Sequence, residues 1–462
     1  MKPKYFLALG LLALGLGSCG ESFFEQYPSN NITEGNFYKT DDDFNQGVVA
    51  CYAKLKTQMS FHLTEIGYRG DENVLESMAV STQNRYDIDH FAETANNGIL
   101  NDIWNAWYNG IYRCNDVLAH MTGAKIANYD KYRGECLFLR SWWYFNLYRV
   151  FGVVPITRTV VTPAAAKLIP RCTEEEMYTL LTEDLAEAAR LLPDTRNAEK
   201  ARVTGIAAYT LLAKVYLTFG KPAEAKTALE EAMKNTSYGL ESTTKKVFDV
   251  GNKMNREIIF ALYYNKTNDN GHGYWYSANT EVLADIRNPT PEFKAIYDGE
   301  KDNRLPLIGT YTKISSNLYA MTKWYDTYDA TYTTQVGNDF PHLRYADVVL
   351  MYAEALAESG GSLGDALEWL NKTRTRAGLD ELTTDEVKSL AEFRRELAAE
   401  RGREFALEGH RWFDLVRLGL AVDYFREMGY SLDSHNLIFP IPQNQIEIVN
   451  NPSILWQNPG FN

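Results

Sequence analysis

A helical hairpin that recurs along the chain constrains the fold more than any other feature of this sequence. In residues 203–235, apolar residues recur at helical spacing, Gly220 ends the first helix, and Pro222 opens the second. Residues 344–378 repeat this arrangement around a turn at Gly360. Because a single helix pair cannot bury its apolar faces alone, several pairs must stack side by side.

Further helix pairs are expected at residues 129–151 with 173–192, and within residues 390–420. Glycine turns and small residues at the helix crossing are typical of the tetratricopeptide repeat, whose period is about 34 residues. The sequence therefore predicts a mostly α protein with a tetratricopeptide-like helical scaffold. A set of unrelated helical hairpins is the alternative.

Two stretches interrupt the helical pattern. Residues 245–343 are rich in Tyr, Thr, Asn, Asp and Gly and lack helical periodicity, and residues 67–97 form a second irregular stretch. Long polar connections inside a compact scaffold are more often functional than idle. We therefore expect a helical region at 19–235, a loop-rich, aromatic region at 236–343, and a second helical region at 344–462.

The first 18 residues have the pattern of a lipoprotein signal peptide. Lys2 and Lys4 precede an apolar run that ends in small residues ahead of Cys19. This run is shorter than the roughly 20 residues that a membrane-spanning helix needs. We expect Cys19 to become the first residue of the mature chain and to carry the acyl chains that anchor it. An ordinary cleaved signal with a chance cysteine is the alternative.

Charge and composition exclude several kinds of partner. The net charge is −13 and becomes −13 − 2 = −15 when the two lysines of the signal are removed. This acidity argues against nucleic acid, because phosphate neutralisation needs clustered Lys and Arg. The His and Cys residues show no metal-ligand spacing, so no metal and no cofactor is expected. The widely spaced Cys51, Cys114, Cys136 and Cys172 are expected as buried thiols, and their disulfide status stays open.

Residues 396–414 offer the strongest argument for an enzyme. Glu396, Glu400, Glu404 and Glu408 recur every fourth residue, so their carboxylates share one helix face and could serve glycoside hydrolysis. Arginines interleave with them, however, and neighbouring guanidiniums lower a carboxyl pKa, whereas a general acid needs a raised one. We expect an ion-paired structural helix and no enzyme activity.

Several longer segments together resemble a known family. They are WNAWYNGIYRCNDVL, RGECLFLRSWWYFNLYRVFGVVPIT, RYADVVLMYAEAL, LNKTRTRAGL, RRELAAERGREFALEGHRWFDLVRLG and the terminal FPIPQNQIEIVNNPSILWQNPGF. In this order they are similar to the SusD/RagB family of outer-membrane nutrient-binding lipoproteins. The resemblance extends from the signal peptide to the last residues, and it covers both helical regions.

The resemblance implies four tetratricopeptide-like helix pairs that carry a variable, loop-rich ligand face. It also implies a lipid-anchored protein on the outer surface of the outer membrane, which binds oligosaccharide or polysaccharide nutrients without cleaving them. The implied partner is a SusC-like TonB-dependent barrel transporter, over which the protein acts as a lid. A tetratricopeptide adaptor, a peptide-binding protein and a glycoside hydrolase are the alternatives.

Candidate ligand-binding residues come from the two irregular stretches. Sugars present C–H-rich faces that pack on aromatic rings, and their hydroxyl groups need amide, carboxylate or guanidinium partners. We expect such residues to converge on one shallow, metal-free site away from the anchor. The candidates are Asp71, Asn84, Arg85, Tyr86, Trp275, Tyr276, Trp324, Tyr325, Asp326 and Tyr328. The alternative for Trp275 and Trp324 is that they fix their loops to the scaffold, as Trp104, Trp142 and Trp412 are expected to fill the helical core.

Overall fold

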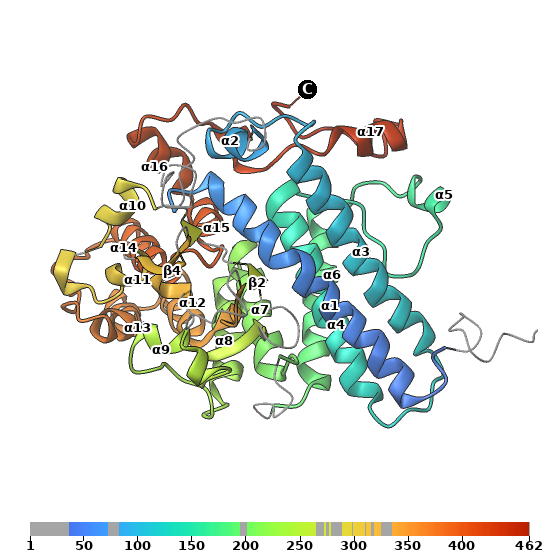
Figure 1. The fold of residues 1–462 in the computed structure, drawn as a ribbon, viewed down its shortest axis with the longest axis horizontal. Coiled ribbons are helices and arrows are strands. Elements are labelled where there is room, and N and C mark those ends of the chain that lie inside the picture. The colour runs from blue at the N-terminus through green and yellow to red at the C-terminus, as the bar shows by residue number, and fades with distance from the viewer. Residues whose placement is uncertain are drawn as a thin grey trace, which may run out of the picture.

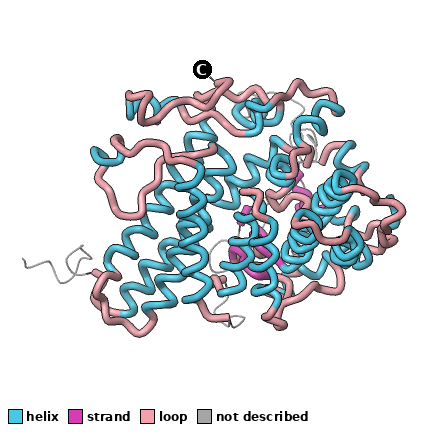
Figure 2. Tube along the Cα trace, turned by 180° about the vertical axis from the view of Figure 1, so that it is seen from behind, coloured by secondary structure: helices cyan, strands magenta, loops and turns pink. Residues whose placement is uncertain are grey.

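The computed structural model describes residues 37–72, 83–194, 201–264, 272–273, 277–278, 289–297, 299–309, 311–315, 318–324 and 335–461. Within these ranges the protein is mostly α-helical, as predicted (Figures 1 and 2). The longer helices are α1 (Asp41–Ile66), α3 (Gly98–His120), α4 (Tyr129–Phe151), α6 (Glu174–Leu191), α7 (Gly205–Thr218), α8 (Pro222–Met233), α12 (Tyr345–Glu358), α13 (Leu363–Arg376) and α14 (Leu390–Glu404). Short helices complete the scaffold: α2 (Gln83–Asp89), α5 (Pro163–Ala166), α9 (Thr244–Val247), α10 (Pro291–Ala295), α11 (Leu305–Gly309), α15 (Arg411–Arg417), α16 (Ala421–Glu427) and α17 (Gln443–Val449).

The longer helices pair in chain order into a continuous stack. α3 packs on α4, α4 on α6, α6 on α7, α7 on α8, α8 on α12, and α12 on α13. α1 lies along α3 at one end of the stack (Figure 1). The predicted helix pairs are therefore confirmed as α4/α6, α7/α8 and α12/α13, and the pair expected within residues 390–420 is α14 with the shorter α15.

The helix boundaries follow from the local signals in the sequence. Gly220 has φ of +67°, a left-handed conformation that ends α7 at little steric cost. Pro222 is the first residue of α8, where its missing N–H costs no helical hydrogen bond. The hydroxyl of Ser362 accepts a hydrogen bond of 3.0 Å from the N–H of Asp365 and caps α13.

Every strand in the described part of the chain lies between residues 258 and 344. β1 (Ile258–Leu262) pairs antiparallel with β7 (Phe340–Arg344), and both strands are buried along their whole length. β2 (His272–Gly273) pairs with β6 (Gln335–Val336), and β5 (Leu318–Met321) lies between β3 (Ser277–Ala278) and β4 (Tyr311–Ser315). This region, which lacks helical periodicity in the sequence, thus combines short strands with the short helices α9 to α11.

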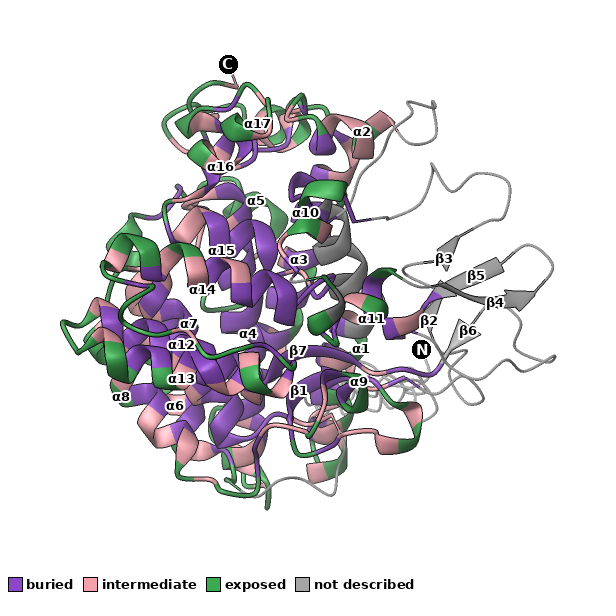
Figure 3. Ribbon diagram, turned by 90° about the vertical axis from the view of Figure 1, so that its left-hand side faces the viewer, coloured by how far each residue is buried: buried purple, intermediate pink, exposed green. Residues whose placement is uncertain are grey.

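One continuous apolar core runs through the helical stack (Figure 3). The indole rings of Trp107 and Trp143 are fully buried, with centroids 6.5 Å apart. Gly110 makes this packing possible, because a Cβ atom there would lie 2.3 Å from the Trp143 ring. Trp104, Trp142 and Trp412 are also buried, as predicted. None of the helices in the described ranges combines the length and apolar character required to span a bilayer.

The four cysteines of the described chain are free and buried. Cys51 lies on α1, Cys114 on α3 and Cys136 on α4, while Cys172 precedes α6. The prediction of buried thiols is confirmed, and these four residues form no disulfide with one another.

Candidate functional site

The predicted site residues divide into two groups. Half of the proposed ligand contacts and the lipidation site lie outside the described residues: Cys19, Trp275, Tyr276, Tyr325, Asp326 and Tyr328. The other five occupy two places in the fold. Asp71 and the α2 residues Asn84, Arg85 and Tyr86 lie in the chain between α1 and α3, and Trp324 ends a short 3-10 helix within the irregular stretch at residues 245–343.

Asp71 is a buried structural residue, so the prediction that it contacts a ligand is wrong. Its side chain is 1% exposed. The two carboxylate oxygens accept hydrogen bonds of 2.9 and 3.0 Å from Arg411 on α15, and the hydroxyl of Tyr424 on α16 donates to the same group at 2.5 Å. Burial of a charge is costly unless the charge is paired, and these hydrogen bonds pair the Asp71 carboxylate. They also join the chain that follows α1 to α15 and α16.

Trp324 is likewise a core residue rather than an exposed sugar platform. It is 1% exposed, stacks on Phe340 of β7 with ring centroids 5.4 Å apart, and packs edge-on against Phe248. The neighbouring Lys323 is buried as well and pairs with Glu408 at 2.7 Å. The polar side chain next to it in the described sequence is therefore internal, and Trp324 packs into the scaffold.

The remaining described candidates share the short helix α2. The side chain of Asn84 is exposed, whereas those of Arg85 and Tyr86 are half-buried. The ring of Tyr86 stacks on His90 with centroids 3.8 Å apart, and Asn97 donates a hydrogen bond of 2.9 Å to the carbonyl of Asn84. The hydrogen bond from Asn97, the N-cap of α3, joins α2 to the start of that helix and leaves the side chain of Asn84 exposed.

The structure places α2 beside α15 and α16. Phe91, which follows α2, packs against Phe425 of α16 and Trp412 of α15, with ring centroids 5.2 and 5.8 Å away. The guanidinium of Arg69 lies over the same aromatic group, 5.3 Å from both the Phe91 and the Trp412 rings. The irregular stretch predicted at residues 67–97 is thus fixed at both of its ends on α15 and α16.

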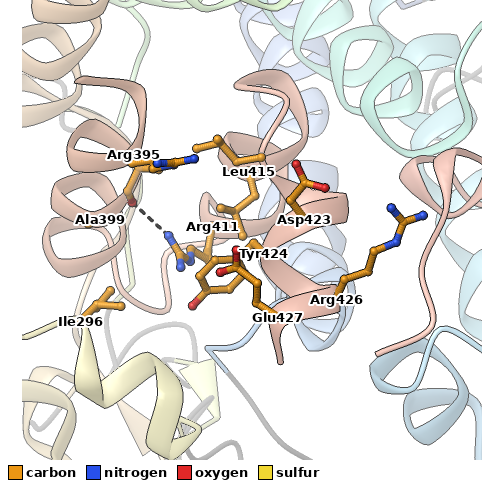
Figure 4. A pocket seen from close by; sticks show the side chains of 11 residues that line it. Ile296, Arg395, Ala399, Arg411, Leu415, Asp423, Tyr424, Arg426 and Glu427 are labelled. Carbon is orange, nitrogen blue, oxygen red and sulfur yellow. Dashed lines mark hydrogen bonds between the residues drawn. The ribbon is translucent and has the colours of Figure 1, made fainter. Parts of the chain in front are cut away.

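A charged pocket of about 530 Å³ opens next to this junction, between α14, α15 and α16 (Figure 4). It is lined by Ile296, Arg395, Ala398, Ala399, Arg411, Leu415, Leu420, Asp423, Tyr424, Arg426 and Glu427. Arg411 forms its inner wall: the guanidinium donates to the Ala398 carbonyl at 3.0 Å and lies 4.9 Å from the centre of the Tyr424 ring. Burial and the Asp71 carboxylate raise the pKa of the Tyr424 hydroxyl, so this group stays a neutral hydrogen-bond donor.

The pocket is lined by both negatively and positively charged side chains. Asp423, Arg426 and Glu427 are exposed on α16, and Arg395 is exposed on α14. Carboxylates accept hydrogen bonds and guanidiniums donate several, so the lining can bind a ligand with many hydroxyl groups. Sequence reasoning missed these residues, although the spacing of Asp423, Arg426 and Glu427 places them on one helix face just after the break at Gly419.

Three of the four acidic residues of the enzyme alternative, Glu400, Glu404 and Glu408, belong to a buried ion-pair network, whereas Glu396 is only partly buried. Glu400 pairs with Arg304 at 2.8 Å and with Arg403 at 3.0 Å. Glu404 contacts Arg304, Arg344 and Arg376. Although burial opposes ionisation, these guanidiniums lower the pKa of both carboxyls. The predicted ion-paired helix is confirmed, but its strongest partners come from distant segments as well as from the neighbouring turns.

Two family profiles match separate N-terminal and C-terminal parts of this chain. A profile described as the SusD family matches residues 305–461, and one described as "Starch-binding associating with outer membrane" matches residues 27–217. SusD-like protein P2 of Formosa agariphila is 26% identical over 99% of this chain and all of its own length. The starch-binding protein SusD of Bacteroides thetaiotaomicron is 33% identical over a shorter region, 31% of this chain and 26% of its own.

Solved structures share the whole fold. A SusD superfamily protein from Bacteroides vulgatus superposes with a TM-score of 0.77 at 24% identity, over 92% of this chain and all of the other. Surface glycan-binding protein A from Bacteroides thetaiotaomicron, in complex with laminarihexaose, gives a TM-score of 0.75 at 21% identity, over 91% of this chain and 99% of the other. The tetratricopeptide-like scaffold and the two profile matches agree: the chain belongs to the SusD/RagB family.

Proposed function

We propose that this protein is a cell-surface lipoprotein that binds oligosaccharide or polysaccharide without cleaving it and delivers it to a TonB-dependent transporter. The observation that carries the proposal is the relationship over nearly the full chain to SusD-like proteins, one of which is described as laminarin-binding. The acidic helix α14 supports binding without cleavage, since the pKa values of Glu400 and Glu404 are lowered and neither is suited to act as a general acid at neutral pH.

The proposed glycan site extends from the outer face of α2 to the charged pocket beside α16. Asn84, Arg85 and Tyr86 would contact the sugar from α2, and Asp423 and Arg426 would bind its hydroxyl groups from the pocket wall. The candidates at Trp275, Tyr276, Tyr325, Asp326 and Tyr328 remain predicted contacts from the loop-rich region. Asp71 contributes indirectly, because its bidentate pair with Arg411 fixes the wall of the pocket.

A polysaccharide binding panel with product analysis tests the proposal. The expected result is retention by at least one neutral glycan, with the glycan recovered intact after prolonged incubation. Recovery of shortened products would support a glycoside hydrolase, and failure to bind any glycan would favour the tetratricopeptide adaptor or peptide-binding alternative. Asn84→Ala and Asp423→Ala should weaken binding without lowering the melting temperature, because both side chains are exposed.

The anchor and the transporter require separate experiments. Cys19→Ala should release the protein from the membrane fraction with its fold intact and should abolish labelling by a fatty-acid analogue. Labelling that persists in the variant would contradict lipidation at this residue. Gentle detergent extraction at native expression should copurify a TonB-dependent barrel, and recovery of the chain alone would argue against the transporter partnership.

A further inference from the structure

A second hollow lies on the opposite side of α3 from its contact with α1. It has a volume of about 780 Å³ and opens between α3, the segment that carries α5, and α17. Figure 1 shows α5 on a loop that stands beside α3, with α17 above the same part of that helix. The rings of Tyr108 and Tyr112, the side chains of Val160 and Ile448, and the amide of Gln445 are among its lining groups. We refer to this hollow as the α3–α17 groove.

Exposed apolar surface is concentrated at this groove. Six large hydrophobic side chains are exposed in the described part of the chain, and Tyr112, Val160 and Ile448 line the groove. Leu168 and Trp456 are sequence neighbours of residues that line the groove. Val49 is the one exposed hydrophobic residue of the six that is unrelated to the groove. Clustered apolar exposure of this kind marks interaction sites, whereas isolated exposed residues are normal on any protein surface.

The wall on the α5 side is held in place by hydrogen bonds from polar side chains of α3. Tyr108 donates a hydrogen bond of 2.7 Å to the carbonyl of Pro155, and Asn115 donates one of 3.0 Å to the carbonyl of Thr157. Asn115 is itself oriented by Arg140, whose guanidinium donates to its side-chain oxygen at 2.8 Å. The wall is therefore preformed, which is the usual state of a small-molecule site.

The wall on the α17 side is also tied to the scaffold. Gln445 donates a hydrogen bond of 3.2 Å to the side chain of Asn105 on α3. Arg171 donates to the carbonyl of Trp456 at 2.9 Å, and its guanidinium lies 4.8 Å from the centre of the Trp456 ring. Two segments almost three hundred residues apart in sequence thus form opposite sides of one rigid groove.

The chemistry of the lining selects a neutral ligand. Lys167 is the only charged residue among the described residues that line the α3–α17 groove. The lining combines aromatic rings with threonine hydroxyls and the amides of Asn105 and Gln445. The hydroxyl of Tyr112 has no hydrogen-bond partner within the described chain, and this residue is 47% exposed. Rings that pack against C–H groups, with amides and hydroxyls between them, are suited to sugar rather than to a charged or wholly apolar ligand.

We propose that the α3–α17 groove is a second carbohydrate site, which binds a segment of a neutral oligosaccharide with one sugar face on the ring of Tyr112. This inference rests on the proposed glycan-binding function and adds a site separate from the α2 face and its charged pocket. The volume of the groove lies within the range of about 300–1,000 Å³ that is usual for ligand pockets. Its concave form and the polar groups along its walls favour a chain of sugars over a flat protein surface.

Calorimetric titration of the full chain with neutral hexasaccharides, beginning with laminarihexaose, tests this inference. Tyr112→Ala and Gln445→Ala should each weaken one class of sites by about tenfold, equivalent to about 1.4 kcal/mol, and should leave the melting temperature unchanged. Asn84→Ala should weaken only the other class. Val49→Ala is the matched control, because Val49 is as exposed as Tyr112 at 47% but lies away from the groove.

The outcomes separate the two proposals. Loss of one class of sites in both groove variants, with the other class retained, supports the second site. Binding by Tyr112→Ala and Gln445→Ala that equals that of the wild type would overturn the groove proposal while leaving the glycan-binding function intact. Absence of sugar binding by the wild-type protein would overturn both. Equal weakening by Val49→Ala would show that the effect is not specific to the groove, and it would also overturn this inference.

Discussion

The two halves of the helical stack bury different kinds of side chain at their helix interfaces. Where α4, α6 and α7 meet, the interface is mainly apolar, and its fully buried residues include Leu139, Leu180, Leu185, Ala207 and Leu211. The buried pair of Arg140 and Asp184 between α4 and α6 is an exception. Where α12 and α14 meet β7, the interface is largely ionic, and its buried residues include Arg344, Asp347, Glu400, Arg401 and Glu404. One helical architecture therefore accommodates two chemically distinct cores.

The ionic core holds together because each charge has partners of the opposite sign. Arg344 contacts Glu257 at 2.7 Å, Glu404 at 2.6 Å and Glu408 at 2.9 Å. Asp347 pairs with Arg401 at 2.9 Å and also contacts Lys214 of α7. A buried ion pair contributes little net stability compared with apolar packing, but removal of one partner leaves a costly unpaired charge. The ionic half should therefore be the less tolerant of single substitutions.

The largest effect is expected from Arg344→Met. This change leaves three buried carboxylates without their shared partner and should lower the free energy of unfolding by about 4 kcal/mol, as measured by guanidinium denaturation. Adding Glu408→Gln should recover part of the loss, since it removes one of the unpaired charges. A loss below about 1 kcal/mol would contradict the interpretation that this cluster is a tightly coupled ionic core.

A slightly smaller loss is expected in the apolar half. Leu180→Ala should create a cavity between α4 and α6 and lower the free energy of unfolding by about 3 kcal/mol. Leu180→Met is the matched control and should cost less than about 1.5 kcal/mol, because it conserves volume. The effect of Leu180→Ala should persist at pH 4, whereas that of Arg344→Met should diminish as the carboxylates become protonated. Equal pH dependence for both variants would remove the distinction between the two cores.

An effect of intermediate size is expected from His342, which lies at the boundary between the two halves. This residue is buried on β7 against Trp142, and burial, reinforced by Lys214 and Arg149, lowers the pKa of its imidazole from 6.5 to about 3. The unfolded chain takes up a proton below pH 6.5 while the folded chain does not, so stability is lost as the pH falls from 6.5 toward 3.

Between pH 7 and pH 5 this single group should account for about 2 kcal/mol of lost stability. The measurement is the free energy of unfolding at both pH values for the wild type and for His342→Leu. The variant should lose less stability over this interval, because it has no proton to take up in the unfolded state. An identical loss in both proteins would show that His342 is not held neutral in the folded protein.

The smallest effect is expected for an ion pair on the surface. Arg158 and Glu183 lie 2.9 Å apart, but their side chains are 44% and 60% exposed. Water and salt screen such a pair, so Arg158→Ala should change the free energy of unfolding by less than about 0.5 kcal/mol. Arg140→Met is the buried comparison, since Arg140 pairs with Asp184 at 2.8 Å with both side chains almost fully enclosed. Comparable losses in both variants would contradict burial as the factor that decides the strength of these pairs.

The candidate site was predictable only in outline. The irregular stretches marked the α2 region, because helical periodicity visibly stops there. Asp71 and Trp324 were misassigned as ligand contacts, since a polar neighbourhood in sequence does not reveal that the neighbours are themselves paired inside the protein. The α3–α17 groove could not be found from the sequence, because its two walls come from distant segments and meet only after folding.

The sequence by itself determined the helical hairpins, because the spacing of apolar residues and the local signals at Gly220, Pro222 and Ser362 act within a few residues. It also predicted ion-paired carboxylates on α14, and Glu400 and Glu404 are paired. Only the tertiary structure decided where that helix lies. Its charged composition is typical of an exposed helix, yet Glu404 is fully buried, since Arg304, Arg344 and Arg376 reach it from elements far away in the chain. Burial of a charge depends on such distant partners, and local periodicity carries no information about them.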